Sequence, residues 1–169
     1  FISGHFANFE LMAMQLEKSG INLASIYRPL NNIFLNVVME KIRKKYICKE
    51  QIKKGTSGVR DLLKLFKNGH SIALMIDQRV SEGIKCKFFN DKAFTTTIPA
   101  QFIKKFNCKV IPIYIERVND INFNIEIENP IEFLKDTSTE TITRDLNSRL
   151  EKMILKNPGQ WIWSHNRWK

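Results

Sequence analysis

The stretch SIALMIDQ, residues 71–78, decides the fold of this chain. Residues 71–76 form a run that is apolar throughout after Ser71, which is typical of a strand buried on both faces of a parallel sheet. Asp77 follows directly, at the C-terminal end of the expected strand, where open α/β sheets gather their functional side chains. We therefore predict a parallel sheet with a site at the C-terminal edge of its strands.

The residues before this stretch alternate between strand and helix patterns. Strands are predicted at residues 1–3 and 22–27, and helices at residues 9–18 and 31–45. A third helix is indicated by apolar residues at i, i+3, i+4 and i+7 from Val59. The helix at 31–45 is amphipathic, and its apolar residues are Phe34, Val37, Val38 and Ile42.

The residues after the stretch continue the mixed pattern. A helix is predicted at 98–106, and strands at 109–118 and 122–128 are close enough in sequence to pair antiparallel. Thr137 with Glu140 forms a capping-box pattern that begins a further long helix. The whole order predicts an α/β fold, with a mixed, mostly parallel sheet flanked by helices, in one domain that covers the chain.

The stretch GHFANFE, residues 4–10, places His5 five positions ahead of Glu10, where a helix is predicted to begin. Five positions turn a helical side chain by about 140°, so the two residues cannot share one helical face. His5 must therefore lie in a turn before the helix if the carboxylate is to contact its ring. One ring nitrogen could then face a substrate while Glu10 accepts from the other, which suits a general base. The alternative is that His5 is a helix cap or an ordinary satisfied polar group.

This stretch resembles the GHxGNWE block of the late acyltransferases of bacterial lipid A biosynthesis, relatives of the lysophospholipid acyltransferases that carry HxxxxD or HxxxxE. Ala7 stands where that family usually has Gly, and Phe9 where it usually has Trp. The resemblance extends over essentially the whole chain, residues 1–169. Further blocks follow in the family's order: Tyr27-Arg28-Pro29-Leu30 with Asn31, Gly58-Val59-Arg60, Asp77-Gln78, Phe88-Phe89, Ala93-Phe94-Thr95-Thr96-Thr97, Val110-Ile111-Pro112, Glu116-Arg117 and Trp161-Ile162-Trp163-Ser164-His165-Asn166-Arg167-Trp168-Lys169.

The resemblance implies a glycerolipid-acyltransferase-like fold and an enzyme that moves a fatty acyl chain from an acyl-carrier-protein thioester to a hydroxyl of a lipid A precursor. It also implies a missing N-terminal region with a membrane anchor, action at the cytoplasmic face of the inner membrane, and no metal or organic cofactor. The sequence has no GxSxG elbow and no Cys close to a His, and its three cysteines lack zinc-site spacing. Direct attack by the acceptor hydroxyl, without an acyl-enzyme, is therefore expected.

Several polar residues are candidates for binding the substrate. Arg28 follows a strand and precedes Pro29, which would aim its guanidinium at a phosphate or an oxyanion, although a surface Arg is the alternative. Asp77 ends the most apolar strand and should have a partner, for which Arg28, Arg60 and Arg79 are candidates; a purely structural ion pair is the alternative. Asn8 could bind substrate or cap the helix that follows it. The residues predicted to bind substrate are Asn8, Arg28, Asn31, Arg60, Asp77 and Gln78.

The charge of the chain favours acidic partners. Its 27 Lys and Arg against 17 Asp and Glu give a net charge of +10, which suits a phosphate-bearing lipid, an anionic membrane surface, an acidic carrier protein or nucleic acid. A basic stretch at residues 41–54 could bind such a partner or could be a solvated surface. Two other functions stay open: a lysophospholipid or glycerol-phosphate acyltransferase, and a basic nucleic-acid-binding domain. The second leaves the spacing of His5 and Glu10 unexplained, so no nucleic-acid partner is predicted.

Overall fold

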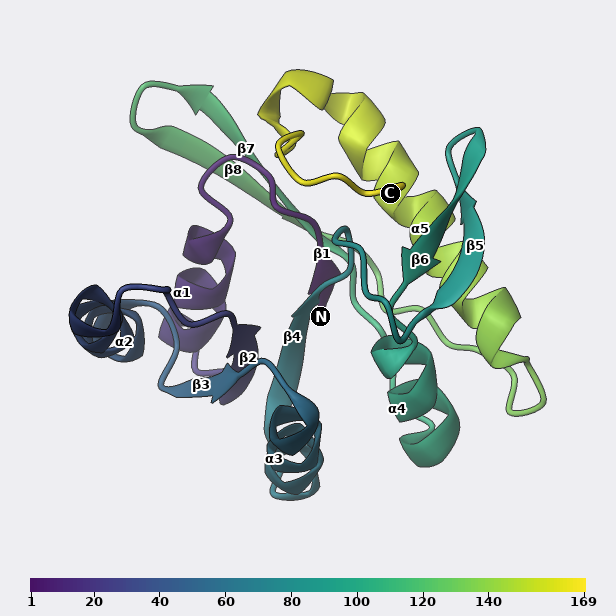
Figure 1. Ribbon diagram of the computed structural model, residues 1–169, viewed down its shortest axis with the longest axis horizontal. Helices are drawn as coiled ribbons and strands as arrows, with labels where there is room; N and C mark the ends of the chain where they lie inside the picture. The colour runs from purple at the N-terminus through teal and green to yellow at the C-terminus, as the bar shows by residue number, and fades with distance from the viewer. The chain divides into compact units, whose positions relative to one another are not determined.

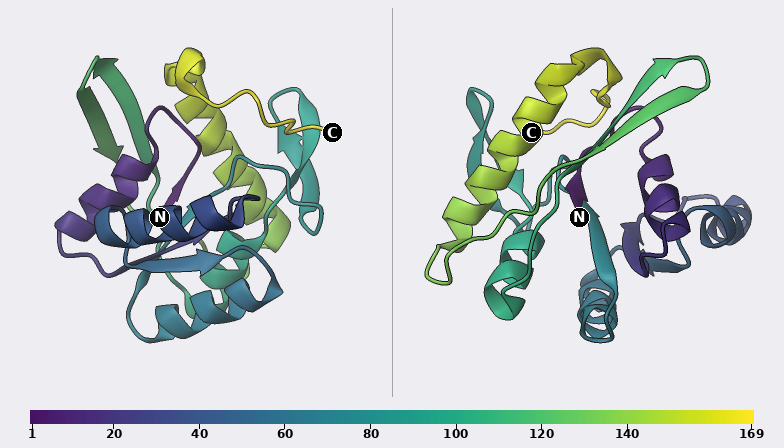
Figure 2. Two further views of the ribbon diagram at one scale, coloured as in Figure 1. Left: turned by 60° about the vertical axis from the view of Figure 1, so that its left-hand side comes forward. Right: turned by 180° about the vertical axis from the view of Figure 1, so that it is seen from behind.

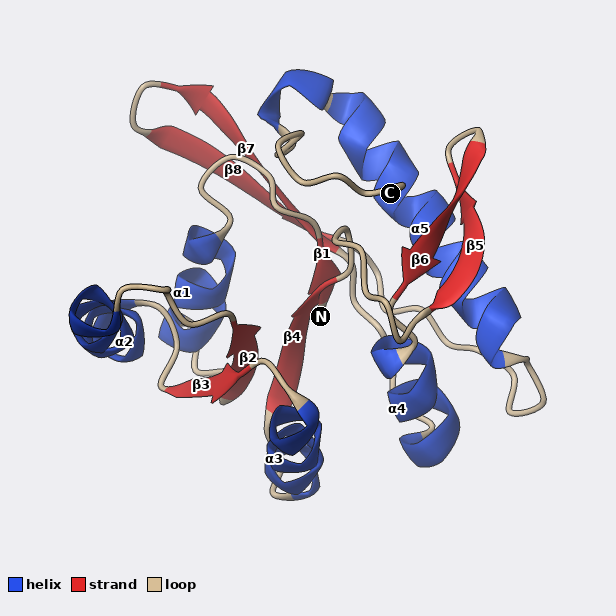
Figure 3. Ribbon diagram, in the orientation of Figure 1, coloured by secondary structure: helices blue, strands red, loops and turns tan.

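The computed structural model describes residues 1–169, apart from the side chain of Thr56. Five α-helices and eight β-strands alternate along the described chain, which confirms the predicted α/β fold class (Figures 1 and 3). The chain divides into two compact units. Unit 1 contains residues 1–9 and 75–169, and unit 2 contains residues 10–74.

Unit 2 is built on three parallel strands. The strand β2 (Leu23–Tyr27) lies between β3 (Glu50–Lys53) and β4 (Ser71–Met75), and it pairs in parallel with both. The strands β2 and β4 confirm the predictions made from their apolar runs. The strand β3 was not predicted, because Ile52 is its only apolar residue and it carries no alternating pattern.

Unit 2 has three helices: α1 (Glu10–Lys18) precedes β2, and α2 (Ile33–Tyr46) and α3 (Thr56–Lys67) connect its strands. The helix α3 covers one face of the strands, and α1 and α2 lie on the other face (Figure 2). This arrangement follows from right-handed crossovers, because the connection through α3 runs back across the sheet in the opposite direction.

The residue that follows β4, Ile76, pairs with the strand before the first loop. The amide of Ile76 donates to the carbonyl of Ser3 at 2.9 Å, so β1 (Ile2–Ser3) lies beside it. The strand order is β1-β4-β2-β3, which confirms the predicted mixed, mostly parallel sheet. Because β1 and β4 are neighbours, the residues that follow them emerge at the same edge.

Two antiparallel hairpins belong to unit 1. The predicted pair is found as β7 (Ile113–Asn119) and β8 (Asn122–Ile127). A second hairpin, β5 (Ile84–Phe88) with β6 (Asp91–Thr95), was not predicted. The alternation of apolar residues with lysines in β5 is a strand signal from which this hairpin could have been predicted.

The helices α4 (Ile98–Phe106) and α5 (Thr139–Lys156) complete unit 1, followed by a short 3₁₀ helix, η1 (Pro158–Gln160). The predicted capping box at Thr137 is wrong: Ser138 is the N-cap of α5, and its Oγ accepts from the amide of Thr141 at 3.0 Å. The residues of α5 that form the core of unit 1 are Ile142, Leu146, Leu150, Met153 and Ile154.

Among the described residues, no helix combines the length and the apolar composition needed to cross a bilayer.

Candidate active site

His5 lies in the loop between β1 and α1, and its main chain is held on both sides. Its amide donates to Asp77 Oδ2 at 2.7 Å, and its carbonyl accepts from the amide of Ile162 at 3.1 Å. The glycine before it packs closely, because a Cβ on Gly4 would lie 2.9 Å from Leu150 Cδ1 and would displace that side chain. The loop therefore presents the imidazole from a fixed backbone.

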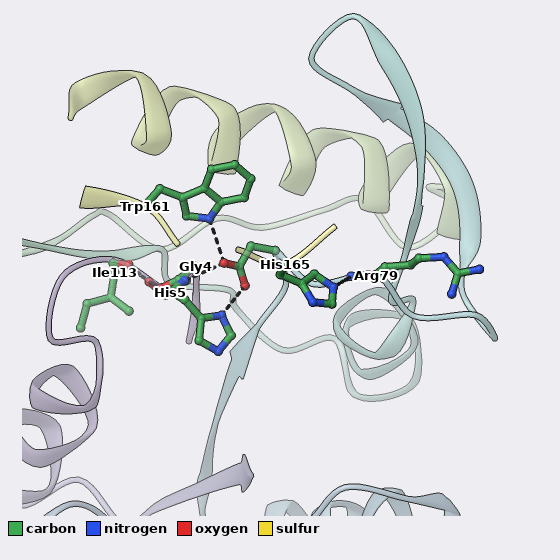
Figure 4. A network of polar contacts seen from close by, with 8 residues as sticks. Gly4, His5, Arg79, Ile113, Trp161 and His165 are labelled. Atoms are coloured by element: carbon green, nitrogen blue, oxygen red, sulfur yellow. Dashed lines mark hydrogen bonds and ion pairs between the residues drawn. The ribbon is translucent and has the colours of Figure 1, made fainter. Parts of the chain in front are cut away.

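The carboxylate of Asp77 is the centre of the site. Its Oδ1 lies 2.7 Å from His5 Nδ1, and its Oδ2 also accepts from Trp161 Nε1 at 2.9 Å (Figure 4). The prediction that an arginine is the partner of Asp77 is therefore wrong. The partner is His5, which reaches Asp77 because β1 and β4 end side by side.

These contacts set the protonation of the pair. Burial to 3% exposure would raise the pKa of Asp77, but the hydrogen bonds and the charge interaction with His5, together with a hydrogen bond from Trp161, outweigh it and hold the pKa below its ordinary value. An ionised carboxylate only accepts, so the Nδ1 that faces it carries a proton, and in the neutral tautomer the lone pair lies on Nε2. No described residue forms a hydrogen bond to Nε2, and the His5 side chain is 18% exposed. The ring can therefore accept a proton from a bound molecule.

The turn after His5 is held by the C-terminal part of the chain. Ala7 adopts a left-handed conformation with a φ of 39°, and its amide donates to the carbonyl of Gln160 at 2.8 Å. The side chain of Gln160 bonds both main-chain polar groups of Arg117. Asn8 Oδ1 accepts from Arg117 Nη2 at 2.8 Å, which ties the turn to β7 of the hairpin. The predicted capping role of Asn8 is wrong, since α1 begins two residues later, at Glu10.

The loop after Asp77 is fixed by a second histidine. His165 Nε2 accepts from the amide of Arg79 at 3.0 Å, as Figure 4 shows. The guanidinium of Arg79 donates to Ser81 and lies over the ring of Phe94. Gln78, between Asp77 and Arg79, is half-buried.

The loop of His5, the carboxylate of Asp77 and the terminal tryptophan all come from sequence blocks that carried the family resemblance. The family model described as bacterial lipid A biosynthesis acyltransferase matches residues 1–169. The chain belongs to this family. A search of curated proteins found none that matches it.

Family membership makes the chain an acyltransferase of lipid A biosynthesis. The predicted site residues fall into two groups along the chain. His5, Asn8, Asp77 and Gln78 lie in unit 1, and the structure brings His5 and Asp77 into direct contact. The other group, in unit 2, consists of Glu10, Arg28, Asn31 and Arg60.

The roles predicted for the four residues of unit 2 stay predictions. Glu10 Oε1 accepts from Arg43 Nε at 3.0 Å, and this is the ion pair that the structure gives it. Arg28, at the end of β2, is exposed, as are Asn31 and Arg60. Their side chains are therefore accessible to a ligand of unit 2.

Two residues of the candidate site were not predicted from sequence: Trp161 and His165. Both come from the terminal block that carried part of the family resemblance. Their contacts with residues 77–79 span more than 80 positions of sequence, so only the folded chain shows them. In the same block Arg167 is fully buried and donates to the carbonyl of Phe94 and to Thr95 Oγ1.

Within the part of the chain that the structure describes, no group of three or more His, Cys, Asp or Glu side chains could hold a metal ion. What the site provides is one imidazole, oriented by a buried carboxylate, with an accessible nitrogen. That arrangement is suited to removing a proton from a hydroxyl.

Proposed function

We propose that this acyltransferase moves a fatty acyl chain from an acyl-carrier-protein thioester to a hydroxyl of a lipid A precursor, with His5 as the general base. The observation that carries the proposal is the 2.7 Å contact between His5 Nδ1 and Asp77, which leaves Nε2 as the basic nitrogen. A positioned base of this kind contributes about a hundred- to ten-thousand-fold in rate.

The proposed reaction proceeds by direct attack. The acceptor hydroxyl attacks the thioester carbonyl while His5 Nε2 takes its proton, and a tetrahedral intermediate forms. The carbon–sulfur bond then breaks, and the thiol of the carrier leaves with the proton from His5. The products are the acylated lipid and the free carrier thiol, and the enzyme returns to its starting state.

We propose that Asp77 is the residue that positions His5. Its two oxygens bond both the ring and the main-chain amide of His5, which fixes the tautomer and the direction of Nε2. The sequence assigned that role to Glu10, five positions from the histidine. The bond of Glu10 to Arg43 supports Asp77 as the stronger candidate.

The proposed partners follow from family and charge. A lipid A precursor is a phosphorylated membrane lipid, and acyl carrier proteins are acidic, so both suit a chain with a net charge of +10. We therefore propose that the enzyme acts at the cytoplasmic face of the inner membrane. Family membership favours acyl transfer over the nucleic-acid-binding alternative.

The test is an assay of the protein with acyl-carrier-protein thioesters and a Kdo-bearing lipid A precursor. The His5→Ala variant should lose about a hundredfold or more of the rate while it stays folded. His70→Ala is the matched control, because His70 is a half-buried histidine of unit 2 outside the proposed site. Equal product from wild type and His5→Ala would overturn the assignment of the base.

A further inference from the structure

The helix α2 has its polarity reversed relative to an ordinary surface helix. Its polar residues face the rest of unit 2: Glu40 Oε1 accepts from the hydroxyl of Tyr27 at 2.5 Å and from Asn36 Nδ2 at 2.7 Å. Asn36 Oδ1 also accepts from the amide of Leu30, and Arg43 bonds Glu10. These bonds fix the rotation of the helix about its own axis.

The apolar residues of α2 face outward in consequence. Phe34 is 87% exposed and Ile33 77%, with Val37 and Val38 each about half exposed. None of the residues of α2 is buried. The amphipathic pattern was predicted correctly, but its apolar side does not pack against the strands, because rotating it inward would break the bonds of Glu40 and Arg43.

The outward face also carries charge. Lys41, Lys44 and Lys45 are exposed and follow the apolar turns along the helix. At 100° per residue, Lys41 and Lys45 lie within about 20° of Phe34 around the axis. The outward face is thus apolar over its first two turns and basic over its last two.

We infer that this face of α2 docks onto an anionic lipid bilayer. Phe34 and its apolar neighbours enter the boundary between headgroups and acyl chains, and the three lysines bind lipid phosphates. The fourteen residues of α2 measure about 21 Å, so the helix lies in the interface and does not span. This inference rests on the proposed location at a membrane, which it extends by naming the element that makes contact.

The distribution of charge favours a bilayer over a second copy of the chain. Two copies meeting through this face with their helices parallel would bring two sets of three lysines together, and like charges at an interface are repulsive. With their helices antiparallel, each set of lysines would lie against the apolar turns of the other copy, where a charge without an acidic partner is costly to bury. An anionic bilayer neutralises the lysines and covers the apolar turns at the same time. The amphipathic segments that bind membrane surfaces have this combination of basic and large apolar residues.

The test is sedimentation of the 169-residue chain with vesicles of phosphatidylcholine, with and without phosphatidylglycerol. The double variant Phe34→Glu/Val38→Glu should bind anionic vesicles about tenfold or more weakly than wild type. The matched control is Val118→Glu/Ile121→Glu, which changes two comparably exposed apolar residues at the end of the β7–β8 hairpin and alters charge equally. The control should bind as wild type does, and circular dichroism should show all variants folded.

A second pair of variants tests the lysines. Changing Lys41, Lys44 and Lys45 to Gln should remove most of the preference for anionic vesicles. Changing three other exposed lysines, Lys85, Lys87 and Lys152, should reduce it less. Equal losses in the two triple variants would mean that net charge, and not this face, directs binding, and would overturn the inference.

The remaining outcomes separate the inference from the proposed function. If wild type binds neither kind of vesicle, the docking face is wrong, whereas the proposed function is judged separately by the acyltransferase assay. If Phe34→Glu/Val38→Glu binds vesicles as wild type does, the inference fails and the location stands. If that variant instead loses affinity for acyl carrier protein without lipid, or loses self-association, the face belongs to the carrier or to a second copy. His5→Ala should bind vesicles normally, so loss of catalysis cannot be mistaken for loss of docking.

Discussion

Asp77 contacts His5 through the ring and through the main-chain amide, and the ring contact decides which nitrogen is basic. In Asp77→Asn, the new amide group can donate to Nδ1 and thereby move the ring proton to Nε2. We expect kcat to fall about a hundred- to ten-thousand-fold with a small change in KM, as wrong-tautomer variants of histidine bases do. Steady-state kinetics across pH measures both constants.

Glu10→Gln is the matched comparison for Asp77→Asn, since it makes the same carboxylate-to-amide change at the residue that the sequence assigned to His5. We expect its kcat to stay within about tenfold of wild type. The opposite ranking, with the larger loss in Glu10→Gln, would return the positioning role to Glu10.

Ala7 occupies a left-handed conformation, with a φ of 39°, at the position where the family usually has Gly. A side chain there costs about 1 kcal/mol, and glycine removes that strain at some cost in unfolded-state entropy. Ala7→Gly should therefore raise the free energy of unfolding by up to about 0.5 kcal/mol. Urea denaturation measures it, with Ala13→Gly inside α1 as the control, which should lose about 1 kcal/mol. A loss of stability in Ala7→Gly would show that the left-handed conformation of Ala7 is not strained.

At the scale of single elements, Ser138 is the cap that holds the first turn of α5. Its Oγ accepts from the amide of Thr141 at 3.0 Å. Ser138→Ala should lower the free energy of unfolding by about 1 kcal/mol, whereas Thr137→Ala should change it by much less. Thermal or urea denaturation distinguishes the two, and a larger loss in Thr137→Ala would restore the cap predicted from sequence.

Local signals explain which elements could be predicted. The helix α4 was predicted with its observed bounds, and local features mark both ends: Pro99 lies in its first turn and Asn107, left-handed, follows its last. The strand β3 could not be predicted, since its partner β2 and not its own composition makes it a strand. The outward rotation of α2 could not be predicted either, because periodicity identifies an apolar face without giving its direction.

At the scale of the whole molecule, the site depended on strand order. The sequence identified His5 and Asp77 as site residues, but 72 positions separate them, and a nearer carboxylate was available at Glu10. Only the placement of β1 beside β4 brings the two together. The contact of Trp161 with Asp77 depends on the same folded arrangement, so the composition of the site could be predicted in part and its pairing could not.

The carboxylate of Asp77, in contact with His5, also makes the stability of unit 1 depend on pH. Its pKa is lowered in the folded state, so the carboxylate stabilises the fold fully above the ordinary aspartate pKa, and this contribution is lost as pH falls through the folded value. We expect the free energy of unfolding to fall more steeply below about pH 4 in wild type than in Asp77→Asn. Tryptophan fluorescence measures it in unit 1, which contains all three tryptophans. Asp61→Asn, an exposed aspartate, should keep the wild-type slope; equal slopes in wild type and Asp77→Asn would mean that the buried carboxylate is not ionised.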